Sequence, residues 1–106
     1  MNDRVRQLEE FLNEDPDDPF NIYALALEYQ KSDVKKAYDL FDQLLNKHAG
    51  YLPTYYTFAH LLADLQESEK TEKVFKTGIE LSKKLNDNKS LKELSNAYTN
   101  WLFEQS

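Results

Sequence analysis

The sequence predicts an all-α protein, and three observations support this prediction. The chain has 106 residues but only 2 glycines and 3 prolines, whereas a β-sandwich or barrel needs a turn residue about every 8–12 positions. Apolar residues recur at intervals of three and four along most of the chain, which is the spacing of one helix face. No segment alternates with a period of two. We therefore expect about six helices of ordinary length, joined by short polar breaks.

The first three predicted helices follow from the breaks around them. Pro16 and Pro19 end the first apolar stripe, and the polar residues 32–33 separate the second stripe from the third. Within each segment the apolar residues share one helical face. The stripes are Val5, Leu8, Phe11 and Leu12; then Ile22, Leu25, Ala26 and Tyr29; then Ala37, Leu40, Phe41, Leu44 and Leu45.

The last three predicted helices follow in the same way. Gly50 and Pro53 end the third stripe, and polar residues at 66–68 and 86–88 bound the fifth. The same helical spacing holds in each segment. The stripes are Tyr55, Phe58, Ala59 and Leu62; then Val74, Phe75, Gly78 and Ile79; then Leu91, Leu94, Ser95 and Tyr98.

Residues at the breaks have the chemistry of helix caps. Asp18, Asp33 and Ser68 stand just before predicted helices, where a side-chain oxygen accepts a hydrogen bond from a free backbone N–H. Pro19 suits a first helical turn. Gly50 suits the left-handed residue that stops a helix.

The start of the last helix has more than one candidate. The segment from Ser90 to Glu93 fits a capping box. Asp87 or Asn88 could equally begin that helix, and the sequence leaves the choice open.

Three of the six stripes share one pattern: a bulky residue, a bulky residue followed by a small one, then another bulky residue. The pattern begins at Ile22, repeats 33 positions later at Tyr55, and repeats again 36 positions later at Leu91. The intervening helices share a second pattern, at Ala37, Phe41 and Leu44 and at Thr71, Phe75 and Gly78. The sequence thus resembles the tetratricopeptide repeat, a helix–turn–helix unit with a period of about 34 residues.

Small residues fit this resemblance. Ala26, Ala59 and Ser95 occupy the same place in the repeated stripe, and a small side chain there lets two helices approach closely. Gly78 costs roughly 1 kcal/mol in helix propensity relative to alanine. We expect close packing at this position to offset that cost.

The resemblance implies one domain over residues 1–106, an antiparallel helix-hairpin repeat stack that winds as a right-handed solenoid. Capping helices with polar outer faces end such stacks. The implied parts are an N-terminal capping helix at 1–15, repeat 1 at 19–49, repeat 2 at 52–85 and a C-terminal capping helix at 88–104.

The resemblance also implies a non-catalytic interaction module, in which the first helices of the repeats line a concave groove for a protein or peptide partner. Phe20, Tyr23 and Tyr56 could equally pack between helices, as aromatic residues often do. The implied groove residues are Phe20, Tyr23, Leu27 and Lys31 from repeat 1, Tyr56, His60 and Asp64 from repeat 2, and Lys92 and Asn96 from the last helix.

One specialisation of the family does not fit. Its chaperone-binding members hold a C-terminal carboxylate with lysine, asparagine and arginine on the first helices. Of the corresponding positions only Lys89 has a suitable side chain, and Glu93 would repel a carboxylate. The others are Tyr23, Leu27 and Thr57. We expect no carboxylate clamp.

The composition of the chain excludes several kinds of site and partner. The chain has no cysteine, which excludes disulfides, thiolate metal sites and cysteine nucleophiles. Its formal net charge of −6 disfavours attraction to nucleic acid phosphates. No stretch approaches the roughly 18 apolar residues that a membrane-spanning helix requires. We expect a cytoplasmic protein that binds neither nucleic acid nor membrane.

Catalytic chemistry has little support. His48 and His60 lack a nearby serine in a suitable turn, and no glycine-rich phosphate loop is present. His60, Asp64 and Glu67 could place three metal ligands on one helical face, but a solvated polar face explains the same spacing. We therefore expect no enzymatic activity and no cofactor.

An alternative function is a structural subunit that assembles through its end helices. Residues 1–19 carry two basic and seven acidic residues, and residues 70–92 carry seven basic and three acidic ones. These charges favour either solvated helix faces or a head-to-tail contact between copies. Trp101, Leu102 and Phe103 either fold back onto the helix at 74–81 or form a homodimer patch; we favour intramolecular cover. The expected state is a monomer or a weak homodimer.

Overall fold

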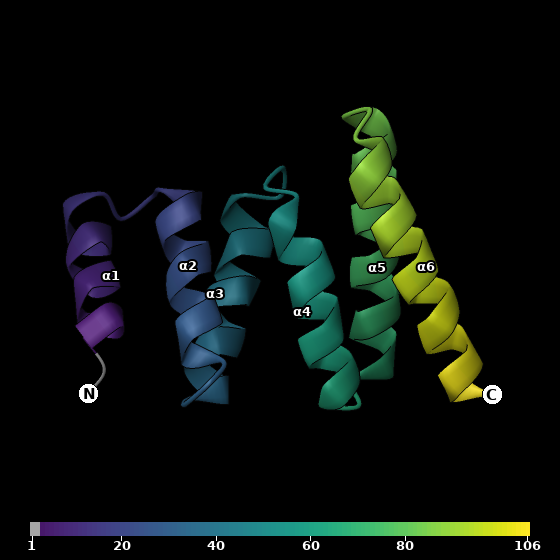
Figure 1. The fold of residues 1–106 in the computed structure, drawn as a ribbon, viewed down its shortest axis with the longest axis horizontal. Helices are drawn as coiled ribbons and strands as arrows, with labels where there is room; N and C mark the ends of the chain where they lie inside the picture. Colours follow the sequence, from purple (N-terminus) through teal and green to yellow (C-terminus); the bar gives the residue numbers. More distant parts are fainter. Residues whose placement is uncertain (1–2) are drawn as a thin grey trace. The chain divides into compact units, whose positions relative to one another are not determined.

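The computed structural model describes residues 3–106, and within them it contains six α-helices and no strand (Figure 1). The predicted all-α class is confirmed. The predicted first helix began at residue 1, and residues 1–2 lie outside the described part of the chain. The helices are α1 (Asp3–Glu14), α2 (Pro19–Tyr29), α3 (Val34–Lys47), α4 (Pro53–Asp64), α5 (Ser68–Lys84) and α6 (Asn88–Gln105).

The chain forms two compact units, Met1–Tyr51 and Leu52–Ser106. In the first unit α2 packs against both α1 and α3, and in the second unit α5 packs against both α4 and α6. Short connections join α2 to α3 and α4 to α5, so each of these pairs is an antiparallel helical hairpin. The boundary between the units falls between the two predicted repeats, whose extent within one domain stays a prediction.

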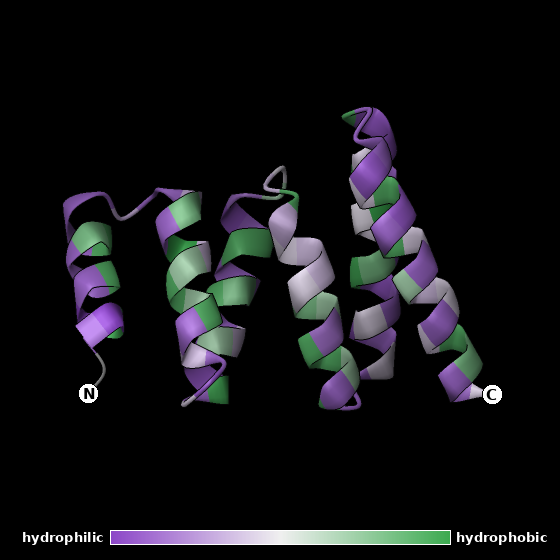
Figure 2. Cartoon of the chain, in the orientation of Figure 1, coloured by the Kyte–Doolittle hydropathy of each residue, from purple (hydrophilic) through white to green (hydrophobic). Residues whose placement is uncertain are grey.

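The core of the first unit consists of the predicted stripes of α1, α2 and α3. Figure 2 shows hydrophobic and hydrophilic residues interleaved along each helix, as expected for helices with one covered face. Four predicted stripe residues are not fully buried. Leu12, Leu40 and Leu45 are half-buried, and Phe11 is 49% exposed, because α1 ends its unit and α2 covers it from one side. The buried residues are Val5, Leu8, Ile22, Leu25, Ala26, Tyr29, Ala37, Phe41 and Leu44.

The core of the second unit has the same construction, with three buried hydroxyl residues added, Thr54, Thr71 and Ser82. Thr71 donates a 2.8 Å hydrogen bond to the carbonyl of Glu67, and Ser82 donates one of 2.8 Å to the carbonyl of Gly78. These two hydroxyls are therefore paired within their own helix, which removes the cost of burying them. The Thr54 hydroxyl, in contrast, is buried with no hydrogen-bond partner among the described residues. The buried apolar residues are Tyr55, Phe58, Ala59, Leu61, Leu62, Val74, Phe75, Leu94 and Trp101.

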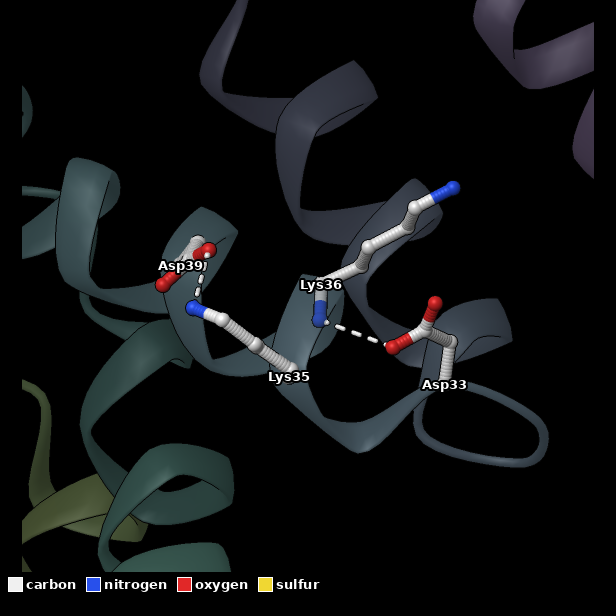
Figure 3. A network of polar contacts seen from close by, with 4 residues as sticks. All are labelled: Asp33, Lys35, Lys36 and Asp39. Carbon is white, nitrogen blue, oxygen red and sulfur yellow. Dashed lines mark hydrogen bonds and ion pairs between the residues drawn. The ribbon is translucent and has the colours of Figure 1, made fainter.

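Aspartates cap three of the helices. The Asp18 carboxylate accepts a 2.9 Å hydrogen bond from the backbone N–H of Phe20. The Asp33 carboxylate accepts a 3.2 Å hydrogen bond from the backbone N–H of Lys36 (Figure 3). Both predicted caps are confirmed. Figure 3 also shows the exposed ion pair between Lys35 and Asp39, at 3.4 Å.

The last helix is capped by Asp87, whose carboxylate accepts a 3.0 Å hydrogen bond from the backbone N–H of Ser90. Among the alternatives left open by the sequence, Asp87 is therefore the cap, and the capping box beginning at Ser90 is wrong. The prediction for Ser68 is also wrong, because Ser68 is the first residue of α5 and Glu67 holds the cap position without a side-chain capping bond.

The left-handed turn residues are not the glycines. Gly50 was expected to have positive φ, but neither glycine does, and α3 instead ends at His48 with a φ of −134°. The positive φ angles belong to Gln66 (62°) and Asn86 (56°), each just after a helix. Next to Gln66, the backbone N–H of Glu67 donates a 3.0 Å hydrogen bond to the carbonyl of Leu62, as in a Schellman motif. The left-handed residues Gln66 and Asn86 therefore let the chain reverse direction within a few residues, between α4 and α5 and between α5 and α6.

Candidate partner-binding groove

A groove of about 510 Å³ lies within the second unit, between one face of α4 and one face of α6. Phe75 of α5 also lines it. The other lining residues are Tyr56, His60, Ala63 and Asp64 from α4, and Glu93, Asn96, Ala97, Asn100, Trp101 and Glu104 from α6.

Helical spacing brings these side chains together. On α4, Tyr56, His60 and Ala63 follow one another at intervals of four and three, so they share a face beside the buried stripe that begins at Tyr55. On α6, intervals of three or four separate lining residues from Glu93 to Glu104. Each helix thus turns its apolar stripe to the core and an adjacent mixed face to the groove.

Aromatic rings run across the groove. The ring of His60 lies 4.5 Å from that of Tyr56 and meets the ring of Phe75 edge-on at 6.0 Å. Phe75 in turn lies 6.2 Å from Trp101, which stacks on Tyr98 at 6.2 Å. Tyr56 is 41% exposed, whereas Trp101 is only 8% exposed. The groove therefore has an aromatic lining that is anchored in the core at Trp101 and open to solvent at Tyr56.

The polar part of the lining is acidic. It contains three carboxylates, from Asp64, Glu93 and Glu104, and no lysine or arginine. Glu93 lies 4.0 Å from Lys89, a contact at the outer limit for an ion pair, and both side chains are largely exposed. Within residues 3–106, Asp64 and Glu104 have no ion-pair or hydrogen-bond partner for their carboxylates. The side-chain amides of Asn96 and Asn100 complete the lining.

No family model and no curated protein matches this chain, but solved structures resemble it, and two of them are described below. One is the solution NMR structure of a tetratricopeptide repeat domain protein from Salinibacter ruber, which is 34% identical with a TM-score of 0.77. The match covers 82% of this chain and 89% of that one. The other is a crystal structure of a tetratricopeptide repeat domain protein from the same organism, 32% identical with a TM-score of 0.75, covering 80% of this chain and 96% of that one.

The chain belongs to the tetratricopeptide repeat family. The predicted resemblance is thereby confirmed, as is the antiparallel helix-hairpin repeat fold. In the family's terms, α2 with α3 and α4 with α5 are the two helix–turn–helix units. The repeated buried positions agree with this assignment, since Ala26 and Ala59 are both fully buried.

Four of the predicted groove residues of this tetratricopeptide repeat protein meet in the second unit: Tyr56, His60, Asp64 and Asn96 all line the groove. Lys92 is exposed on α6 but does not belong to the lining. It lies one position before Glu93, which does, while Asn96, the other residue predicted on α6, lies in the lining.

The remaining predicted residues lie on α2 in the first unit. Phe20 is 62% exposed, and Leu27 is also exposed. Lys31 pairs with Glu28 at 3.5 Å on the surface. Tyr23 is half-buried, with its ring 6.2 Å from Phe41 and 5.7 Å from Tyr51. The alternative of packing between helices therefore describes Tyr23, whereas Phe20 projects into solvent.

Several lining residues were not among the predicted site residues, namely Ala63, Phe75, Glu93, Ala97, Asn100, Trp101 and Glu104. A signal for the residues on α6 was available. Intervals of three and four from Asn96 reach Glu93 and Asn100, and a further interval of four reaches Glu104. Phe75 carried no such signal, because a core stripe and the floor of a groove have the same spacing.

The predicted fold-back of the C-terminal residues holds for one of the three. Trp101 is covered within its own unit, against Phe75 and Tyr98. Leu102 and Phe103 are exposed, Phe103 by 75%, so the prediction of cover is wrong for them. The reason is helical geometry, because consecutive residues point about 100° apart and cannot all face one neighbour.

The metal alternative is not supported by the structure. Among residues 3–106 no group of three histidine, cysteine, aspartate or glutamate side chains is placed to hold a metal ion. His60 and Asp64 share a face of α4, but Glu67 lies beyond the left-handed residue Gln66, where the helix has ended. In the described part of the chain, no helix combines the length and apolar character needed to cross a membrane.

Proposed function

We propose that this tetratricopeptide repeat protein is a non-catalytic interaction module that binds a segment of a protein partner in the groove between α4 and α6. The observation that carries the proposal is the groove itself, which combines exposed aromatic surface with unpaired polar groups. Helical repeat proteins use surfaces of this kind to bind partners. The groove's volume of about 510 Å³ is in the range of ligand pockets.

The lining has the groups that a peptide needs. Tyr56 and Trp101 supply large rings with few rotatable bonds, which is the usual chemistry of energetically dominant interface residues. The amides of Asn96 and Asn100 each offer donors and an acceptor, so they match the N–H and C=O groups of a peptide backbone. Phe20, Leu27 and Lys31, which are exposed on α2, are proposed as contact residues of the first unit, whereas Tyr23 packs between helices.

A protein partner is favoured over nucleic acid by charge. The chain carries a formal net charge of −6, and the groove lining contains three carboxylates and no lysine or arginine. A phosphate backbone would be repelled by this surface.

A capture experiment tests the proposal. The immobilised chain is exposed to extract of its native cells, and Tyr56→Ala/Asn100→Ala is compared with Thr99→Ala, a substitution at an exposed α6 position outside the lining. We expect partners to be lost from the double variant and kept by the control, with circular dichroism showing that both remain folded. Equal capture by all three chains would overturn the proposal.

A second candidate function is assembly of copies through the end helices. The observation that favours it is the exposure of Leu102 and Phe103 at the end of α6. Sedimentation velocity of wild type and Leu102→Ser/Phe103→Ser tests it. A larger species that disappears in the variant would support assembly, and a monomer in both would remove it.

A further inference from the structure

We infer that the segment bound in the α4–α6 groove is positively charged, with a lysine or arginine side chain seated against the groove's aromatic rings. This inference rests on the proposed function, since it specifies the partner's chemistry at the same groove. It is carried by three features of the groove: its carboxylates without a close cation, the exposed ring of Tyr56 and its volume.

The carboxylates of the groove have no close cation among the described residues. Asp64 and Glu104 have no partner among residues 3–106, and Glu93 has only the distant contact to Lys89. Most other acidic side chains on α3 and α5 differ, as with Asp39 beside Lys35 and Glu80 beside Lys83. Three acidic groups around one groove sum to a negative potential that attracts a cationic segment and repels an acidic one.

The aromatic lining suits the same ligand. A lysine or arginine head within about 6 Å of a ring centroid is attracted to the face of the ring. The described part of the chain forms such contacts outside the groove, among them Lys36 at 5.2 Å from the centroid of Tyr29 and Lys70 at 5.4 Å from that of Phe58. Tyr56, partly exposed in the groove, offers a ring of the same kind to a cation from a partner.

The size of the groove, about 510 Å³, admits a long side chain. Ala63 on α4 and Ala97 on α6 line it with single methyl groups, so space remains between the helices. Phe75 and Trp101 are almost fully buried, so the ring surface open to a ligand is that of Tyr56. The aliphatic stem of lysine or arginine can lie against this ring while its charged head reaches the carboxylates.

The experiment selects ligands without assuming one. A phage-displayed random dodecapeptide library is panned on the immobilised full chain, and the leading peptides are synthesised. Trp101 is the single tryptophan and lines the groove, so its fluorescence reports occupancy directly. The test variant is Glu93→Gln/Glu104→Gln. The matched control is Glu69→Gln/Glu80→Gln, which changes net charge equally at exposed positions of α5 outside the groove.

We expect the selected peptides to be enriched in lysine and arginine, to change Trp101 fluorescence, and to bind the test variant about tenfold more weakly than the control. Binding should weaken between about 50 and about 500 mM salt. Acidic or neutral peptides that change Trp101 fluorescence and bind both variants equally would overturn the inference and leave the proposed function standing. Selection of no peptide that changes the fluorescence would overturn both. Self-association lost only in the test variant would make the occupant a second copy, which also overturns the inference.

Discussion

A β-carbon added to Gly78 would lie 2.7 Å from the β-carbon of Tyr55, so α4 and α5 approach too closely there for a side chain. The expected close packing at Gly78 is confirmed. Gly78→Ala gains about 1 kcal/mol of helix propensity, but the two backbones must separate. We predict a net loss of about 1–3 kcal/mol in the free energy of unfolding, measured with urea.

The other glycine is a matched control. A β-carbon at Gly50 would meet no atom within 4 Å, and its φ is not positive. Gly50→Ala should therefore leave stability unchanged or raise it by up to about 1 kcal/mol, because alanine restricts the unfolded chain. Equal losses in the two variants would show that crowding at Tyr55 is not the cause.

Trp101 should contribute much more to stability than its neighbour Phe103. Trp101 packs against Phe75 and Tyr98 and is 8% exposed, whereas the ring of Phe103 is mostly in solvent. Trp101→Ala should lower the free energy of unfolding by about 3 kcal/mol, followed by circular dichroism. Phe103→Ala should change it by less than about 0.5 kcal/mol. If Phe103→Ala costs as much, the ring must be covered in solution by another copy, and sedimentation would reveal it.

Tyrosine hydroxyls link helices at equivalent places in both units. Tyr98 donates a 3.1 Å hydrogen bond from α6 to the Glu72 carboxylate of α5, and Tyr29 donates one of 3.2 Å from α2 to Glu9 of α1. Burial, followed by the bond to the carboxylate, raises the pKa of each phenol above its ordinary value of 10.0. Each phenol therefore keeps its proton more firmly in the folded chain than in the unfolded one.

The resulting prediction concerns alkaline pH. Stability from these raised pKa values is fully present below pH 10, the unfolded value, and is lost as the pH rises through the folded values. The free energy of unfolding should fall above pH 10, and less so in Tyr29→Phe/Tyr98→Phe than in wild type. At pH 8 each single substitution should cost about 1 kcal/mol. The same alkaline fall in both chains would contradict the assignment to these hydroxyls.

Gln66 holds a left-handed conformation at a cost. Its φ of 62° is unfavourable for a residue with a long side chain, whereas glycine adopts it freely. Gln66→Gly should raise the free energy of unfolding by about 1 kcal/mol. Asn86→Gly, at a φ of 56°, should give a smaller gain because asparagine tolerates this region better. A loss of stability in Gln66→Gly would contradict the expected relief of backbone strain.

The predictions of helices and helix caps are confirmed where residues close together in the sequence determine the structure. The stripes beginning at Ile22 and Tyr55 are buried, and Asp18 and Asp33 cap their helices. These features depend on residues within a few positions of one another, which the sequence displays directly. The left-handed turns at Gln66 and Asn86 were missed, since neither residue is the glycine that usually marks such a turn.

The candidate groove could be predicted only in part, for a geometric reason. Tyr56, His60, Asp64 and Asn96 line the groove, and their register within a repeat places them on one side of their helices. Lys92 lies outside the lining and its neighbour Glu93 lies in it, because a one-residue step rotates a side chain by about 100°. The acidic character of the lining therefore appears only in the tertiary structure.

The sequence by itself determined the helices, the repeat and the family of this protein, because spacing and capping act over short distances along one chain. Only the tertiary structure decided that Phe75 and Trp101 line a groove while also packing in the core, and that Asp64, Glu93 and Glu104 surround it. These residues belong to three helices and are as many as 40 positions apart. Their meeting depends on how α4 and α6 pack against α5, which no local pattern records.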